Sequence, residues 1–203
     1  MALTTVLLFG DRRPPRPLAG STTAHITDPA QIDGALGDAR RLAVVGSDAD
    51  LAAVLSRLMR SERLDIEVAH VRPGPLCRLR ARRAGSAPAL RVPLIRDDTG
   101  TVLVGAALWL PPEGAGRLNG EAVVDDTVLF DGEVSGVRIE PTGSMPGLRA
   151  RVLGRPGARW VSGRAAQLGT TGVRVVRDGA TGRREAKRST FYRHTTGWLR
   201  VDC

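Results

Sequence analysis

The first 75 residues alternate between short apolar runs and segments with helical periodicity. The runs Thr4–Phe9, Leu42–Val45 and Asp65–Val71 are rich in β-branched and aliphatic residues, which predicts strands. A helix signal begins at Asp28-Pro29, where an acid precedes a proline at the first helical position. A second helix begins at Asp48, with apolar residues at Leu51, Val54, Leu55, Leu58 and Met59. Strand–helix–strand–helix–strand predicts a small Rossmann-like βαβαβ lobe with a parallel sheet.

After Pro88 the pattern changes to short apolar runs separated by turn residues, without a long helix. This spacing predicts an antiparallel β-sandwich lobe. The linker composition of residues 84–88 places the boundary there, so we expect an α/β lobe over residues 1–88 and a β-rich lobe over 89–203. The predicted strands are Leu90–Ile95, Thr101–Leu110, Thr127–Phe130, Val134–Ile139, Leu148–Leu153, Val173–Val176, Ser189–Tyr192 and Trp198–Val201.

Positive charge is concentrated in the middle and C-terminal parts of the chain. The net charge is +9, with 29 arginines and one lysine, but residues 1–75 carry nine basic and nine acidic side chains. Four arginines, Arg78, Arg80, Arg82 and Arg83, lie within eight residues and predict either an anion-binding segment or a solvated loop. Aromatic residues are only 3% of the chain, which disfavours nucleic acid as a partner and makes an anionic lipid headgroup the favoured partner of the two.

Several familiar chemistries are excluded by the absence of their motifs. Cys77 and Cys203 have neither zinc-site spacing nor a disulfide framework, which indicates a reduced, cytoplasmic protein. No apolar run is long enough for a membrane span, although peripheral membrane binding stays open. The chain has no Walker A motif, dinucleotide-binding glycine motif, zinc-protease motif or nucleophile elbow.

The turn at Gly46-Ser47-Asp48 is the most informative junction. A strand that passes through a small-residue turn directly into a helix presents free backbone N–H groups to a phosphate. Asp48 and Asp50 would repel phosphate unless a divalent cation bridged them. The alternative is that Ser47 or Asp48 only caps the helix, and the segment alone leaves both interpretations open.

The sequence of residues 44–51 resembles the apolar strand and Gly-Gly-Asp-Gly-Thr loop of the diacylglycerol kinase and sphingosine kinase catalytic family, grouped with NAD kinases in one superfamily. Arg72-Pro73-Gly74-Pro75 resembles the family's second nucleotide turn, and Val173–Gly179 resembles its strand ending in Asp-Gly-Glu. The resemblance implies ATP and magnesium as cofactors, nucleotide contacts from Gly46, Ser47, Asp48, Pro73 and Gly74, magnesium binding at Asp48, and a catalytic role for Asp178.

Departures from the family pattern imply a shortened, degenerate member. Ser47 and Ala49 replace two loop glycines, Asp50 replaces the threonine, and Ala180 replaces the glutamate after Asp178-Gly179. Phosphoryl transfer depends on positioning and charge neutralisation, so these losses predict a protein without kinase activity. We expect such a protein to bind phosphate, nucleotide or lipid, or to have a regulatory role. Two alternatives stay open: an active ATP- and magnesium-dependent lipid kinase, and a basic peripheral module that binds anionic lipid without nucleotide.

Asp131-Gly132-Glu133 is a complete Asp-Gly-Glu sequence, but it lies too early in the chain to match the family's motif. Asp-Gly between β-branched runs predicts a hairpin turn there, and the same prediction applies to Asp178-Gly179. A lone histidine near a strand end, His194, is predicted to be structural.

Overall fold

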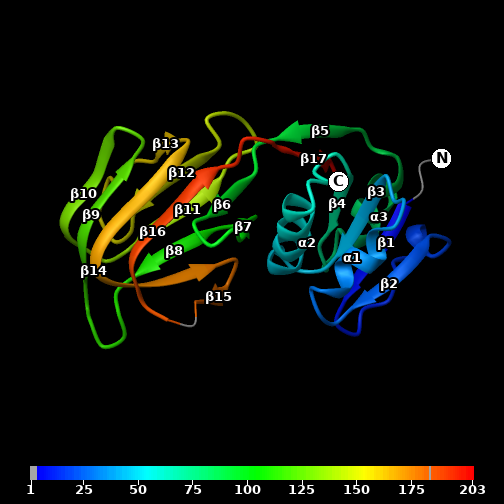
Figure 1. Cartoon of the computed structure of the whole chain (residues 1–203), viewed down its shortest axis with the longest axis horizontal. Coiled ribbons are helices and arrows are strands. Elements are labelled where there is room, and N and C mark those ends of the chain that lie inside the picture. The colour runs from blue at the N-terminus through cyan, green and yellow to red at the C-terminus, as the bar shows by residue number, and fades with distance from the viewer. Residues whose placement is uncertain (1–3, 183) are drawn as a thin grey trace. The chain divides into compact units, whose positions relative to one another are not determined.

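The computed structural model describes residues 4–182 and 184–203 and divides the chain into two compact units (Figure 1). Unit 1 contains the residues up to Val92 together with Thr196–Cys203, and unit 2 contains Pro93–Thr195. Compared with the division expected from the sequence, unit 1 also includes residues 89–92 and 196–203. These residues form the edge of its sheet by pairing with each other and with β4.

Unit 1 is built on a six-stranded sheet in the order β2-β1-β3-β4-β17-β5. All pairs are parallel except β17 with β5. The predicted α/β class is confirmed, and β3 is buried at every position, as expected for a strand covered on both faces. The strands are β1 (Thr4–Phe9), β2 (Thr22–Ile26), β3 (Arg41–Val45), β4 (Glu67–Val71), β5 (Ala89–Val92) and β17 (Trp198–Val201).

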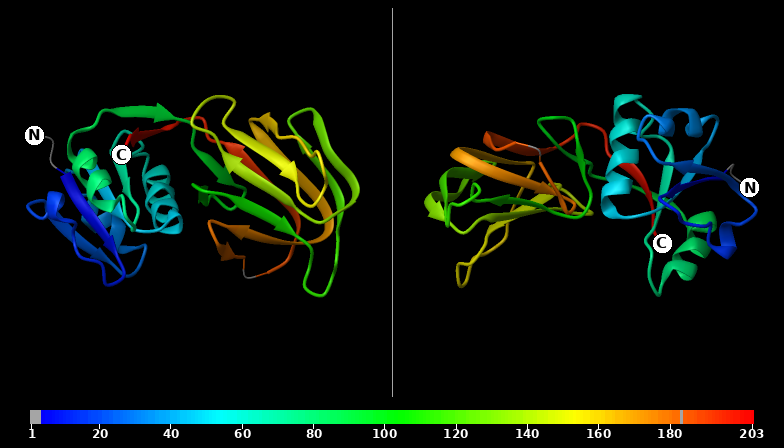
Figure 2. Two further views of the ribbon diagram at one scale, coloured as in Figure 1. Left: turned by 180° about the vertical axis from the view of Figure 1, so that it is seen from behind. Right: turned by 90° about the horizontal axis from the view of Figure 1, so that it is seen from below.

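Helices cover both faces of this sheet, with α2 and α3 on opposite sides (Figure 2). They are α1 (Gln31–Leu36), α2 (Asp48–Arg60), α3 (Cys77–Ser86) and the 3-10 helix η1 (Arg16–Leu18). The predicted apolar stripe of α2 is buried apart from the half-buried Met59. Asp28 accepts a hydrogen bond from the Ala30 backbone N–H at 2.7 Å, so it closes the turn before α1, which begins three residues after it.

The arginine-rich segment predicted as a loop or anion-binding segment is the helix α3. Its Ala81 and Ala84 are fully buried in the core between α3, η1 and the sheet. Small side chains at helical spacing allow α3 to pack closely, while its arginines extend from the other faces. The high arginine content concealed this short apolar stripe in the sequence.

Unit 2 is the predicted antiparallel β-sandwich, an 11-stranded assembly in which the long strand β14 belongs to both layers. Residues 166–170 of β14 pair with β9, and residues 174–177 pair with β8. The strands are β6 (Ile95–Asp97), β7 (Val102–Leu103), β8 (Ala107–Leu110), β9 (Leu118–Val124), β10 (Thr127–Val134), β11 (Val137–Pro141), β12 (Leu148–Val152), β13 (Val161–Gly163), β14 (Ala165–Arg177), β15 (Ala180–Thr181) and β16 (Ala186–Arg193).

The core of unit 2 is centred on Trp109 and Phe191, both fully buried with ring centroids 6.1 Å apart. The Trp109 indole Nε1–H donates to the Ser189 hydroxyl at 2.9 Å, which satisfies its polar edge. A second buried polar contact joins Asp97, which has no exposed surface, to the Arg177 guanidinium. The hydroxyl and backbone N–H of Thr99 also donate to the Asp97 carboxylate.

One hairpin prediction is confirmed and the other is wrong. Asp178 and Gly179 have positive φ and connect β14 to β15 as a two-residue turn. Asp131-Gly132, in contrast, lies within β10, where Gly132 is opposite Gly120 of β9. The β9–β10 turn is instead at Asp125-Asp126, with Asp125 at φ 49°. β9, which the sequence did not predict, supplies the partner that keeps Asp131-Gly132 extended.

The return of the chain to unit 1 predicts a specific stability effect. Val201 of β17 is 2% exposed, so Val201→Asp places an unpaired carboxylate in the core and should lower the free energy of unfolding by about 3 kcal/mol or more. Leu90→Asp, on the paired strand β5 but 59% exposed, should cost less than about 1 kcal/mol. Urea unfolding measures both, and equal losses would contradict the assignment of β17 to the core of unit 1.

Candidate functional site

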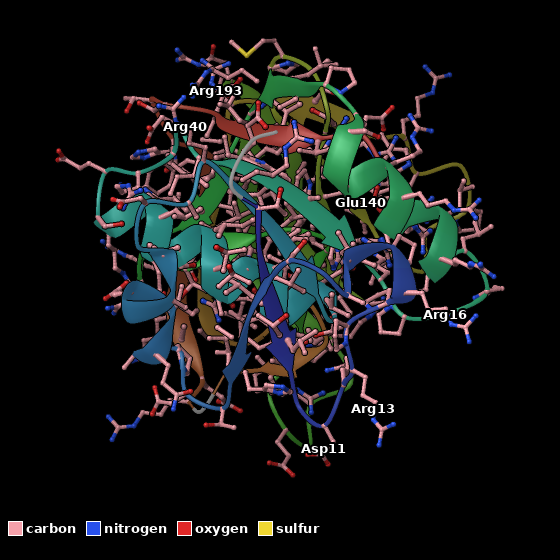
Figure 3. All side chains as sticks on the ribbon, turned by 90° about the vertical axis from the view of Figure 1, so that its right-hand side faces the viewer. Asp11, Arg13, Arg16, Arg40, Glu140 and Arg193 are labelled. Carbon is pink, nitrogen blue, oxygen red and sulfur yellow. The ribbon has the colours of Figure 1, made fainter. Side chains whose placement is uncertain are left out.

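The carboxyl ends of the parallel strands of unit 1 bring together some of the groups expected from the sequence. The segments that follow β1, β3, β4 and β17 meet along this edge. In open α/β sheets, ligands bind at this edge, between two neighbouring strands from which the chain leads to opposite sides of the sheet. Here these strands are β1, which is followed by β2 on one side, and β3, which is followed by β4 on the other. Arg13 and Arg16 of the segment after β1 are exposed and point away from the ribbon (Figure 3).

The N-terminus of α2 is closed by the side chain of its own third residue. The Asp50 carboxylate accepts hydrogen bonds from the Ser47 backbone N–H at 2.7 Å and from the Ser47 hydroxyl at 2.8 Å. In return, the Asp50 backbone N–H donates to the Ser47 hydroxyl oxygen at 3.2 Å, which completes a capping box. The capping interpretation of this turn is therefore confirmed, with Ser47 as the N-cap residue.

Gly46 is needed for this closed arrangement. A Cβ atom at residue 46 would lie 2.5 Å from the Asp50 Oδ2 atom and 2.8 Å from its Cβ. The Asp50 carboxylate thus occupies the space in front of the first turn of α2, next to the backbone of Gly46. The side chain of Arg12, from the segment after β1, approaches the same carboxylate at 3.9 Å.

Asp48, the predicted magnesium ligand, forms an ion pair with Arg72. The Arg72 Nη2 atom lies 2.6 Å from Asp48 Oδ1, and His70 Nδ1 lies 3.7 Å from the same oxygen. Among residues 4–182 and 184–203, no three acidic, histidine or cysteine side chains are grouped closely enough to hold a metal ion. A single carboxylate that already binds a guanidinium is a poor donor set for magnesium, which prefers several oxygen ligands.

His70 connects the end of β4 to the turn before α2. Its Nε2–H donates to the Gly46 carbonyl at 3.1 Å, and its Nδ1 accepts from Arg72 Nε at 3.4 Å. Burial lowers the pKa of His70, an effect opposed by the hydrogen bond to Gly46 and reinforced by the charge of Arg72. The imidazole is therefore neutral at pH 7, and its Nε2–H holds the Gly46 carbonyl through a hydrogen bond.

The remaining residues predicted in unit 1 are only partly brought together. Pro73 and Gly74 lie in the exposed turn between β4 and α3. On α3, Arg78, Arg82 and Arg83 are exposed, and Arg83 lies 3.3 Å from Asp202 after β17. Arg80 alone is half-buried and lines a cavity at the carboxyl edge of the sheet. The four arginines thus project around the helix rather than converging on one anion.

Asp178, the predicted catalytic residue, holds a loop of unit 2 in place. Its carboxylate accepts hydrogen bonds from the backbone N–H groups of Val104, Gly105 and Ala106, at 3.0, 2.7 and 3.1 Å. The three donors belong to the connection between β7 and β8. This arrangement gives Asp178 a structural role, and a catalytic role stays a prediction.

The two-part fold is that of NAD kinases and diacylglycerol kinases, as the sequence resemblance predicted. Similar solved structures include an NAD kinase from Archaeoglobus fulgidus in complex with ATP, with a TM-score of 0.67 and 12% identity over 98% of this chain and 93% of that chain. Another is a diacylglycerol kinase from Bacillus anthracis str. Sterne, with a TM-score of 0.73 and 10% identity over 100% of this chain and 97% of that chain.

The sequence itself matches no protein-family profile and no curated protein. At 10–12% identity, the likeness to the solved structures establishes the fold of this chain. None of the helices in the described parts of the chain is long and apolar enough to cross a membrane.

Three residues of the carboxyl edge were not predicted as site residues from the sequence. Arg200 and Cys203 come from the last strand and its end, and they reach unit 1 only because β17 pairs with β4. His70 carries a weak signal, since it is a polar residue between the apolar Ala69 and Val71 near the end of its strand. Its position beside Gly46 depends on the register in which His70 is opposite Val44.

The contacts of Asp178 predict a loss of stability on substitution. Asp178→Ala leaves three backbone N–H groups without their acceptor and should lower the free energy of unfolding by about 3 kcal/mol. Asp131→Ala, which removes an exposed carboxylate from β10, should change it by less than about 0.5 kcal/mol. Denaturant unfolding distinguishes the roles, because a purely catalytic Asp178 could be replaced without loss of stability.

The buried histidine predicts a pH-dependent stability. The folded pKa of His70 lies below its ordinary value of 6.5, so the unfolded chain binds the proton first as the pH falls. The contribution of the neutral His70 to the free energy of unfolding is complete above pH 6.5, and it is lost as the pH falls towards the folded pKa of His70.

His70→Gln should therefore flatten the decrease in unfolding free energy between about pH 7.5 and 5. Part of the decrease should remain, because burial and Arg96 also lower the pKa of His194. Replacement of His25, an exposed residue of β2, is the control. An unchanged slope in His70→Gln would contradict the prediction.

Proposed function

We propose that this protein is a non-catalytic relative of the kinases that share its fold, and that it binds a phosphate-bearing ligand without transferring a phosphoryl group. The ligand is a nucleotide or an anionic lipid headgroup, and binding serves a regulatory role. The observation that carries the proposal is the Asp50 carboxylate, which accepts the Ser47 hydrogen bonds at the start of α2.

The closed turn does not fit a nucleotide phosphate. A phosphate at a helix N-terminus needs the first N–H groups of the helix and the positive end of its dipole. Here the Ser47 N–H is 2.7 Å from a fixed carboxylate, which also adds a negative charge at the position of the incoming anion. The Arg72–Asp48 ion pair likewise engages the carboxylate that magnesium would need.

Basic groups beside the closed turn support a ligand that carries phosphate. Arg80 of α3 and Arg200 of β17 both line the cavity at the carboxyl edge of the sheet. Guanidinium groups bind phosphate through paired, charge-assisted hydrogen bonds and do not need the glycine-rich turn of a kinase. Recognition of phosphate can therefore persist after the loss of the nucleotide turn.

The proposal predicts no phosphoryl transfer from ATP. Purified protein incubated with magnesium, radiolabelled ATP and extracted lipids should transfer no label. The reason is that the Asp50 carboxylate occupies the place of a phosphate at the start of α2. Transfer by the wild-type protein that is abolished in Asp48→Ala would contradict the proposal and favour an active lipid kinase.

Opening the turn should restore phosphate affinity at α2. Asp50→Thr removes the competing charge and frees the Ser47 N–H, so ATP with magnesium should bind at least about tenfold more tightly by calorimetry. Asp65→Asn, which neutralises an exposed carboxylate before β4, should leave the affinity unchanged. Circular dichroism confirms that both variants are folded. Equal ATP affinities of Asp50→Thr and wild type would show that Asp50 does not block the turn.

A further inference from the structure

A cavity of about 330 Å³ opens beside the closed turn, at the carboxyl ends of β4 and β17. It differs from the expected nucleotide site, because neither Gly46 nor Ser47 nor the Pro73-Gly74 turn lines it. The chain segments that meet there are far apart in the sequence and are joined by the pairing of β17 with β4. Its lining consists of His70, Arg72, Arg80, Arg200, Val201, Asp202 and Cys203.

Two of the three arginines in this cavity have no acidic partner in the described part of the chain. Arg72 is paired with Asp48, and Asp202 is paired with Arg83 on the surface of α3. Arg80 and Arg200 form no ion pair within residues 4–182 and 184–203, and both are half-buried. Half-buried guanidinium groups without a carboxylate retain charge and hydrogen-bond donors for an anion.

Two other polar groups of the cavity, His70 and Cys203, carry no charge that would oppose an anion. His70 is neutral and directs its Nε2–H to the Gly46 carbonyl. The Cys203 thiol donates to the His70 carbonyl at 3.4 Å. Burial raises the pKa of Cys203, which keeps the thiol uncharged at pH 7. The cavity therefore presents Arg80 and Arg200 beside the neutral His70 and Cys203. Its one carboxylate, Asp202, is paired with Arg83.

From this arrangement we propose that Arg80 and Arg200 bind a phosphate monoester dianion in the cavity at the ends of β4 and β17. The inference rests on the proposed function, and it assigns phosphate recognition to α3 and β17 instead of the turn before α2. A volume of 330 Å³ is near the lower limit for ligand sites, so the ester group is a small alcohol or the headgroup portion of a lipid.

The position of the two arginines strengthens this assignment. Arg80 lies one helical turn after Cys77 at the start of α3, and Arg200 lies in the strand that pairs with β4 in parallel. A site built on a helix and a strand of the core holds its guanidinium groups more rigidly than an exposed loop does. Arg82, in contrast, is exposed on the same helix and does not line the cavity.

Calorimetry with glycerol 3-phosphate tests the site in the full-length protein. Arg80→Gln and Arg200→Gln should each weaken binding at least about tenfold, because each removes one charge-assisted contact. Arg82→Gln provides a matched control on α3 and should retain the wild-type affinity within about twofold. Thermal unfolding of all variants confirms that they are folded under the conditions of the titration.

Vesicles of phosphatidylcholine with and without phosphatidic acid distinguish the two sources of the phosphate. Sedimentation with phosphatidic acid that depends on Arg80 and Arg200 assigns the site to a lipid headgroup. Calorimetric binding of glycerol 3-phosphate without sedimentation assigns it to a soluble ester, and either result supports the site. Absence of both, or binding that is equal in wild type, Arg80→Gln and Arg200→Gln, would overturn it.

Different results would contradict the proposed function and the assignment of phosphate binding to the cavity. Phosphoryl transfer from ATP by the wild-type protein overturns the non-catalytic role, even where Arg80→Gln weakens binding of the phosphate ester. Conversely, phosphate binding that is insensitive to Arg80 and Arg200 overturns the cavity, even where no transfer from ATP is detected.

Discussion

The hydrogen bonds between Asp50 and Ser47 fix the turn at the start of α2, on the carboxyl edge of unit 1. Together with the bond from the Asp50 N–H to Ser47, they give the Ser47 and Asp50 N–H groups partners within the chain, at a helix start of the kind that can accept a phosphate. An intramolecular carboxylate is always present, whereas a ligand must first lose translational freedom to reach the same N–H groups. The turn before α2 is consequently stable without ligand, and the contacts of Gly46, His70 and Arg72 are arranged around it.

This edge of the sheet thus has a closed part and an open part. At the end of β3, the acids near the start of α2 are engaged by Ser47 and Arg72. At the ends of β4 and β17, Arg80 and Arg200 line a cavity. The same parallel sheet supports both parts, so the fold is compatible with a closed turn before α2. In the proposed function, arginine side chains rather than the backbone N–H groups of α2 bind the phosphate.

Local sequence patterns predicted the parts of the fold that depend on local physics. The apolar run Leu42–Val45 and the stripe on α2 indicated a buried strand and an amphipathic helix, and both are present. The helix α3 was missed because its buried stripe consists of the small residues Ala81 and Ala84 between arginines. The turn expected at Asp131-Gly132 failed because β9 pairs with those residues, a tertiary contact that overrides the local preference for a turn.

The sequence predicted those residues of the candidate site that lie directly after a predicted strand. Gly46 and Ser47 were placed at a strand-to-helix turn by the sequence alone, and the capping interpretation of that turn is confirmed. Arg200 could not be placed, because its position depends on a strand that returns more than 100 residues after β5 to pair with β4. Nor could a sequence pattern show that Arg80 alone among the clustered arginines would line a cavity.

The claim that Asp50 closes the turn of α2 is tested most directly by two-dimensional amide NMR of the ¹⁵N-labelled protein during titration with ATP and magnesium. The account predicts that the Ser47 and Asp50 amide resonances keep their positions, because their N–H groups already have partners within the turn. Saturable shifts of the Ser47 and Asp50 amides at the same ATP concentrations would contradict it, since they would show that phosphate displaces the carboxylate from the start of the helix.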